Sequence, residues 1–379
     1  MKINSLISIF SLLSALCLMG CISGNKTTPK AFNQEIYTPQ YASGFKILGA
    51  ENTRSTMIQI TNPWQGAKDV KMSYFISRNG ELPPKGFTGL AIPAGAKRIV
   101  CMASAYIAML DILEQTDRIV GVSGINFISN PYVLAHKDSI QDMGPEMNYE
   151  LLIGLKPDVV LLYGIGDAQT AITDKLKELS IPSMYFGEYL EESPLGKAEW
   201  LVVMSELTNS REKGIKIFQE IPKRYQALKK LTESVEQRPT TMFNTPWNDT
   251  WVMPSTQSYM AQLVTDAGAD YIYKENTSNS SVPIGLETAY GLIQKADYWI
   301  NVGSPSTLGE LKAMNPKFAD AKAVREKTVY NNNLRLTPAG GNDYWESAVV
   351  HPDIVLRDLI HIFHPELISD STYYYRHLE

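Results

Sequence analysis

The chain has 379 residues, of which 44% are hydrophobic and 20% are charged, and its formal net charge is −5. This composition excludes global disorder, and a chain with no basic block is not expected to bind nucleic acid. Its three cysteines are too few for a disulfide framework or a four-thiolate zinc site. The length fits two domains or one large one.

The first twenty residues have the pattern of an export signal. Lys2 precedes an uncharged, mostly apolar stretch from Ile3 to Met19, which is shorter than a typical membrane span. The residues Leu18-Met19-Gly20-Cys21 resemble the bacterial lipobox, in which the cysteine is lipidated and becomes the new N-terminus. We therefore expect a lipoprotein signal peptide at 1–20, a lipid on Cys21 and a flexible tether at 21–40. An ordinary signal peptide with an incidental cysteine is the alternative.

Residues 41–92 have the pattern of a small β-sheet. Segments 45–48, 55–61 and 70–77 alternate apolar and polar residues, and turn residues separate them. We expect a small antiparallel β extension in front of the main fold, with no function assigned to it.

From Arg98 onward, short apolar runs alternate with helical patterns. The strand-like runs 98–102, 118–122 and 159–164 are separated by helical stretches, which predicts a parallel sheet covered on both faces. The second half repeats this order. In both halves a glutamate opens a helix that ends in a Lys-x-Asp turn and an apolar strand, as at Glu150 and Glu287. The sequence therefore predicts two similar α/β lobes, at 93–208 and 237–379. Cys101 lies within the first of these strands and is expected to be a buried structural thiol.

A long amphipathic helix is predicted between the lobes, at residues 209–236. Apolar residues recur there every three or four positions, from Ile215 to Val235. Pro222 lies inside this segment and is expected to kink or split the helix.

Several segments resemble helical-backbone (class III) periplasmic substrate-binding proteins, which serve ABC importers of iron-siderophores, haem and vitamin B12. The resemblance covers residues 95–367, and the order of the segments carries it more than any single motif. The matching segments are 98–104, 117–122, 148–150 and 155–160 in the first lobe, and 258–260, 266–269 and 286–287 in the second.

The resemblance implies two Rossmann-like lobes with parallel sheets, joined by the long connecting helix. It also implies a monomer, lipid-anchored in the periplasm or cell envelope, that captures a metal chelate between the lobes and turns nothing over. The expected ligand is a ferric siderophore, with a corrinoid or haem as alternatives, and no intrinsic cofactor is expected. The partner would be an ABC permease dimer with its ATPase, and Glu150 and Glu287 match the family's glutamates that dock onto permease arginines. The same two residues would also favour the helix N-termini that they occupy.

Ligands of such proteins sit where loops leave the carboxyl ends of parallel strands. Large aromatic side chains in polar loops are expected to line this cleft, although each could instead fill the core of its own lobe. The nominated residues are Ser104, Tyr106, Asn126, Tyr132 and Tyr163, with the turn at 164–166, and Trp247, Trp251, Tyr259, Arg335, Tyr344 and Trp345.

Parts of the sequence are compatible with three other functions. A zinc or manganese binder needs several histidines in the cleft, and the chain has five, of which His361 and His364 share one apolar helix end. An envelope glycoside-processing enzyme could use Asp343 and Glu346 as a carboxylate pair, but no other catalytic motif accompanies them. A surface lipoprotein serving an outer-membrane transporter is the third, and the residues after Cys21 carry no acidic run that would favour it.

Overall fold

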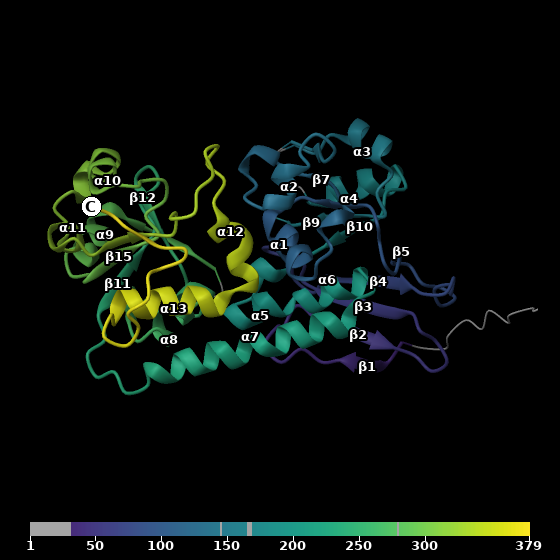
Figure 1. The fold of residues 1–379 in the computed structure, drawn as a ribbon, viewed down its shortest axis with the longest axis horizontal. Helices are drawn as coiled ribbons and strands as arrows, with labels where there is room; N and C mark the ends of the chain where they lie inside the picture. Colours follow the sequence, from purple (N-terminus) through teal and green to yellow (C-terminus); the bar gives the residue numbers. More distant parts are fainter. Residues whose placement is uncertain (1–31, 145, 165–168, 279) are drawn as a thin grey trace, which may run out of the picture.

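The computed structural model describes residues 32–144, 146–164, 169–278 and 280–379. The predicted signal peptide, Cys21 and residues 165 and 166 lie outside these ranges. Two α/β units lie side by side along the long axis of the molecule, and a further β-sheet adjoins the first unit (Figure 1). The predicted α/β class, with parallel sheets and an N-terminal β extension, is confirmed.

The N-terminal sheet has the strand order β1-β2-β3-β4-β5, in which neighbouring strands are antiparallel except for the parallel pair β4 and β5. Its strands are β1 (Gln34–Tyr37), β2 (Phe45–Gly49), β3 (Thr56–Thr61), β4 (Lys71–Ser77) and β5 (Leu90–Pro93). The prediction of a flexible tether up to residue 40 is wrong over its last part, because β1 pairs with β2. The mostly polar composition around β1 gave no alternation from which to predict a strand.

Buried glutamates join this sheet to the rest of the chain. Glu199 is fully buried and accepts four hydrogen bonds of 2.6–2.8 Å from residues 37–42. Glu191 accepts hydrogen bonds from the backbone N–H groups of residues 43 and 44 and from the Nε1–H of Trp200. Glu206 forms an ion pair of 2.6 Å with Arg78. Because a buried carboxylate is costly unless it is fully bonded, these contacts fix the sheet firmly against the first unit.

The first unit is built on a five-stranded parallel sheet with the order β10-β9-β6-β7-β8. Its strands are β6 (Ile99–Cys101), β7 (Ile119–Val122), β8 (Gln141–Asp142), β9 (Val159–Leu162) and β10 (Ser183–Tyr185). Its helices are α1 (Ser104–Ile112), α2 (Pro131–Ala135), α3 (Tyr149–Leu155) and α4 (Gln169–Glu178). Cys101 is 1% exposed within β6, as expected for a structural thiol, and burial raises the pKa of its side chain.

The second unit has the strand order β13-β11-β15-β16-β17, parallel except for β17. Its strands are β11 (Thr240–Phe243), β13 (Asp270–Tyr271), β15 (Tyr298–Ile300), β16 (Val329–Asn331) and β17 (Arg376–His377), and β12 (Thr250–Met253) pairs separately with β14 (Val282–Gly285). Its helices are α8 (Tyr259–Asp266), α9 (Leu286–Ile293), α10 (Leu308–Met314), α11 (Lys322–Glu326), α12 (Asp343–Ser347) and α13 (Pro352–Phe363).

The repeated Lys-x-Asp turn has the same structural role in both units. Asp158 accepts the backbone N–H groups of Lys97 and Arg98 at 2.6 and 3.0 Å, just before β6. Asp297 accepts the N–H of Thr240, at the start of β11, at 2.7 Å. Each aspartate therefore ties the end of one helix to the start of the strand that comes first along the chain in its sheet.

The strand orders of the two units nevertheless differ. Counted along the chain, the strands of the first sheet run 3-2-1-4-5 and those of the second run 2-1-3-4-5. In the first sheet the connections reverse direction between β6 and β9. Crevices for ligands form at such a reversal, outside the carboxyl ends of the strands.

Three helices connect the units: α5 (Pro194–Glu199), α6 (Leu201–Leu207) and α7 (Arg211–Leu231). The 21-residue helix α7 packs against α6 beside the first unit and against α13 in the second (Figure 1). It continues through Pro222, with buried Phe218, Ile221 and Tyr225 on both sides of the proline. Packing of this face offsets the lost backbone hydrogen bond, so Pro222 does not split the helix.

Candidate functional site

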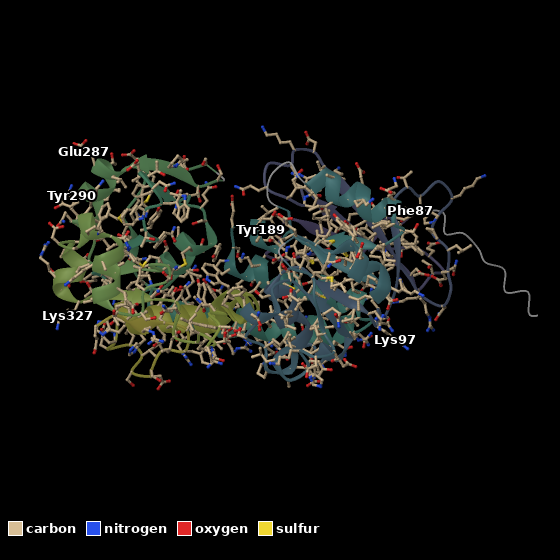
Figure 2. All side chains as sticks on the ribbon, turned by 90° about the horizontal axis from the view of Figure 1, so that it is seen from above. Phe87, Lys97, Tyr189, Glu287, Tyr290 and Lys327 are labelled. Atoms are coloured by element: carbon tan, nitrogen blue, oxygen red, sulfur yellow. The ribbon has the colours of Figure 1, made fainter. Side chains whose placement is uncertain are left out.

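A cavity of about 370 Å³ lies between the two units. Figure 2 shows Tyr189, one of its lining residues, in the middle of the molecule, where the two halves face each other. The lining combines small apolar, aromatic and a few charged side chains. These are Ala103, Ser104, Ala105, Tyr163, Glu188, Tyr189, Pro194 and Lys197 from the first half of the chain, and Tyr259, Leu263, Tyr344, Trp345, Ala348, Val349, Pro352 and Val355 from the second.

The first unit contributes the carboxyl ends of two strands. Residues 103–105 follow β6 and begin α1, and Tyr163 directly follows β9. Because β6 and β9 flank the reversal of strand order, the cavity opens at the crevice that this topology creates.

The second unit contributes helices. Tyr259 is the first residue of α8, Tyr344 and Trp345 lie in α12, and residues 348–355 belong to the 3₁₀ turn η5 (Ala348–Val350) and the start of α13. Tyr344 is 4% exposed, whereas Trp345 is 59% exposed. Trp345 is therefore the aromatic side chain that is most available to a ligand in this wall.

Direct contacts join the two units around the cavity. The Ser104 hydroxyl donates to the backbone carbonyl of Trp345 at 3.4 Å, and the Ser129 N–H donates to Glu346 Oε2 at 2.9 Å. Lys197, in α5, places its ammonium group 4.4 Å from the centre of the Tyr259 ring. The units are thus held close by polar and cation–π contacts beside the cavity.

Glu188 is the unusual polar group of the cavity wall. It lies in the 3₁₀ turn η3 (Glu188–Leu190), is 4% exposed, and its Oε2 atom has no hydrogen-bond partner among the described residues. Burial raises the pKa of this carboxyl to about 7, and Lys197 opposes the shift. Burial likewise lowers the pKa of Lys197, whose ammonium donates a long hydrogen bond of 3.4 Å to the Glu188 backbone carbonyl.

The N-terminal sheet supports one wall of the cavity. The Tyr189 hydroxyl donates to the carbonyl of Gly164 and accepts the N–H of Gln65, which lies in the loop between β3 and β4. Trp64 in the same loop packs against Tyr185, with ring centres 5.3 Å apart. The extension thus contributes to positioning Tyr189.

Five of the nominated ligand residues come together in this cavity: Ser104, Tyr163, Tyr259, Tyr344 and Trp345. Arg335 lines a second, more polar interlobe cavity, where it pairs with Asp343 at 2.6 Å. The other nominated residues line neither of these two cavities: Tyr106, Asn126, Tyr132, Trp247 and Trp251.

Two of these belong to lobe cores. Tyr106 is fully buried and donates to the Leu162 carbonyl at 3.0 Å, and Trp251 is fully buried and donates to the Phe243 carbonyl at 2.9 Å. Trp251 alternates inward along β12, where a large side chain fills the core, and its polar atom finds a backbone partner.

The remaining three lie in loops or short helices. Tyr132 stacks on His136 with ring centres 4.0 Å apart, and Asn126 is exposed. Trp247 is 75% exposed beside the short strand β12.

Sequence reasoning missed Glu188, Tyr189 and Lys197. A usable signal existed, since Glu188 and Tyr189 closely follow the apolar run 184–186, which overlaps β10, and so lie near the carboxyl end of a strand. Lys197 could not be found this way, because it reaches the cavity from α5, which no sequence pattern had placed between the lobes.

The two histidines at the end of α13 have structural partners. The ring nitrogens of His361 and His364 contact the backbone carbonyls of Ile368 and Gly268 at 2.8 and 3.0 Å. Over the described ranges, no group of three or more His, Cys, Asp or Glu side chains is arranged to hold a metal ion. Nor does any helix in those ranges have the length and apolar character needed to cross a membrane.

Glu150 and Glu287 occupy equivalent places in the two units. Glu150 lies in the first turn of α3 and Glu287 in the first turn of α9, and both are exposed. Figure 2 shows Glu287 toward the far end of the second unit, away from Tyr189 and the cavity.

Residues 99–333 match the family model described as periplasmic binding protein. Among curated proteins, the chain is similar to an uncharacterized lipoprotein of Methanocaldococcus jannaschii, with 25% identity over 95% of this chain and 92% of that protein.

Solved structures share the fold. A periplasmic binding protein from Veillonella parvula superposes with a TM-score of 0.60 and 15% identity, covering 83% of this chain and 99% of that one. A periplasmic heme binding protein from Pseudomonas aeruginosa gives a TM-score of 0.58 and 15% identity, covering 75% and 98%.

Proposed function

The chain belongs to the periplasmic binding protein family, in the class III branch that it resembles by sequence, and on that premise we propose that it delivers a metal chelate to an ABC importer. The ligand would be a ferric siderophore first of all, with a corrinoid or haem as alternatives. The family and fold are those of binding proteins rather than enzymes.

The observation that carries this proposal is the aromatic cavity between the units. It opens at the reversal of strand order in the first sheet, and Tyr163, Tyr189, Tyr259 and Trp345 contribute ring surface to its walls. Such surface suits a flat or partly aromatic chelate. The periplasmic heme binding protein from Pseudomonas aeruginosa shares this fold, which supports a chelate as the ligand.

The proposal includes a membrane anchor and a docking surface. Lipidation of Cys21 would hold the protein at the membrane, and the similarity to an archaeal lipoprotein supports this. Glu150 and Glu287 would each meet an arginine of the permease, since both are exposed and lie at matching helix starts.

The test is thermal unfolding of the purified protein with haemin, cyanocobalamin and ferrichrome, together with the visible absorption spectrum of protein isolated from its own host. A ligand present at 100 times its Kd adds about 2.7 kcal/mol to the free energy of unfolding. At least one chelate should raise the unfolding temperature. Hydrolysis of a glycoside, with no shift from any chelate, would instead favour an enzyme.

A further inference from the structure

We infer that Lys197 and Glu188 recognise a carboxamide group of the ligand, the amide oxygen accepting from Lys197 and the amide N–H donating to Glu188. This inference rests on the proposed function and narrows its ligand class. These two charged side chains share the wall of the cavity.

Lys197 and Glu188 lie close together but do not pair. Within the described ranges, no ion pair joins Lys197 to a carboxylate, and the nearest bond of its ammonium is the 3.4 Å contact with the Glu188 backbone carbonyl. The ammonium lies 4.4 Å from the centre of the Tyr259 ring, and both residues line the cavity. Its donors are therefore not used up by the protein.

Glu188 supplies the complementary group. It is 4% exposed, and Oε2 has no partner among the described residues although the residue lines the cavity. A buried polar atom without a partner costs free energy, so a native structure that retains one usually has a use for it. A ligand donor would satisfy this oxygen.

The Lys197 ammonium is a hydrogen-bond donor and the nearby Glu188 oxygen is an acceptor. Together they favour a ligand group that carries both an acceptor and a donor. A carboxamide presents one acceptor and one N–H donor side by side, so it satisfies both residues at once. A carboxylate would satisfy Lys197 but would face the Glu188 oxygen, unless Glu188 is protonated. The remaining lining is largely apolar or aromatic, which adds no second cation for an acidic ligand.

Carboxamides occur on corrinoid side chains and in the peptide backbone of hydroxamate siderophores, whereas haem carries carboxylates. The experiment therefore measures Kd at pH 8, where a carboxyl group with a pKa of about 7 is mostly ionised, for cyanocobalamin, ferrichrome and haemin. Binding is followed by fluorescence quenching of the tryptophans. The variants are Lys197→Met, Glu188→Leu and the conservative Glu188→Gln. The controls are Lys97→Met and Glu192→Leu, both at exposed positions.

An amide-bearing probe should bind the wild type, and Lys197→Met and Glu188→Leu should each weaken it about tenfold, as expected for one lost hydrogen bond to a charged group. Glu188→Gln keeps an oxygen acceptor and should lose less, while the controls should not change. Whichever amide probe responds identifies the source as corrinoid or peptide. Because Glu188→Leu removes an unsatisfied buried group, its unfolding temperature should not fall, which separates the ligand role from a structural one.

Three results would overturn the inference. Binding of haemin alone would leave the proposed function standing and refute the carboxamide. Unchanged affinity for an amide probe in both Lys197→Met and Glu188→Leu would refute the roles of these residues. Failure of all three chelates to bind the wild type would refute the proposed function, and this inference with it.

Discussion

The ammonium of Lys197 lies 4.4 Å from the centre of the Tyr259 ring, so a cation on α5 rests against an aromatic face at the start of α8. The contact borders the cavity, and burial around it lowers the pKa of Lys197 and raises that of Tyr259 to about 12. A partly desolvated cation–π contact is worth about 1–2 kcal/mol. It therefore contributes to the spacing of the lobes as well as to the lining of the cavity.

The ring of Tyr259, rather than its hydroxyl, should hold this contact. Tyr259→Phe keeps an aromatic face and should unfold in urea at the wild-type midpoint, whereas Tyr259→Leu should lose about 1–2 kcal/mol of unfolding free energy. The two midpoints and slopes, measured on the same preparation, check this. Equal losses in both variants would show that the hydroxyl, and not the ring, stabilises the site.

Gly341 should fix how closely the lobes approach. A Cβ atom at this position would lie 2.5 Å from the backbone carbonyl oxygen of Phe127 in the other lobe. Because the clash is with backbone, only a movement of the main chain can relieve it. Gly341→Ala should therefore separate the lobes, and small-angle scattering should record a larger radius of gyration.

The matched control is Gly291→Ala in α9, where an added Cβ meets no atom within 4 Å. It should leave the scattering unchanged and stabilise the helix by up to about 1 kcal/mol. An unchanged radius of gyration in Gly341→Ala would mean that the loop at 336–342 yields without moving the lobes.

Stability should fall as pH rises from about 4.5 to about 7. Burial raises the pKa of Glu188 and of Glu346 to about 7, so the folded state holds these protons more tightly than the unfolded state. Their favourable contribution is complete below pH 4.5 and is lost as pH rises through the folded pKa, by about 3 kcal/mol for each group. The charge of Lys197 lowers the pKa of Glu188, and the charge of Glu191 raises it.

Urea unfolding of the wild type and of Glu188→Leu at pH 5, 6, 7 and 8 measures this contribution. The variant should lose less stability across the series, because one of the two groups is gone. Parallel curves for the two proteins would show that Glu188 titrates near its ordinary value.

Charge reversal at the two exposed glutamates should stop transport without changing ligand binding. Glu150→Arg and Glu287→Arg place like charges against the proposed permease arginines, which costs several kcal/mol across an interface. Uptake by cells should fall most in the double variant, while ligand titration of the purified proteins should give the wild-type Kd. Normal uptake would leave both residues with only a role at their helix N-termini.

Sequence periodicity located most of the regular elements in this chain. The predicted strands at 45–48, 55–61 and 70–77 correspond to β2, β3 and β4. Asn148 caps α3, accepting the Leu151 N–H at 3.1 Å. These signals are local, because side-chain alternation and caps depend on neighbouring residues.

Contacts between residues far apart in the sequence could not be predicted from these local patterns. β1 forms because its edge pairs with β2 and because Glu199, about 160 positions away, accepts hydrogen bonds from the chain that follows it. The site shows the same limit. An aromatic residue after a strand can line a cleft, as Tyr163 does, or fill a core, as Trp251 does, and only packing between distant segments decides.

The most direct test of the account is calorimetric titration of a metal chelate into the wild-type protein and into a variant whose interlobe cavity is blocked by a larger side chain. Ala348 lines this cavity, and Ala348→Phe would place a ring within it. The account predicts that the wild type binds a metal chelate with a stoichiometry of one and that Ala348→Phe, folded to the same extent by circular dichroism, loses that binding. Equal affinity in both proteins would contradict the account, because the ligand would then bind elsewhere.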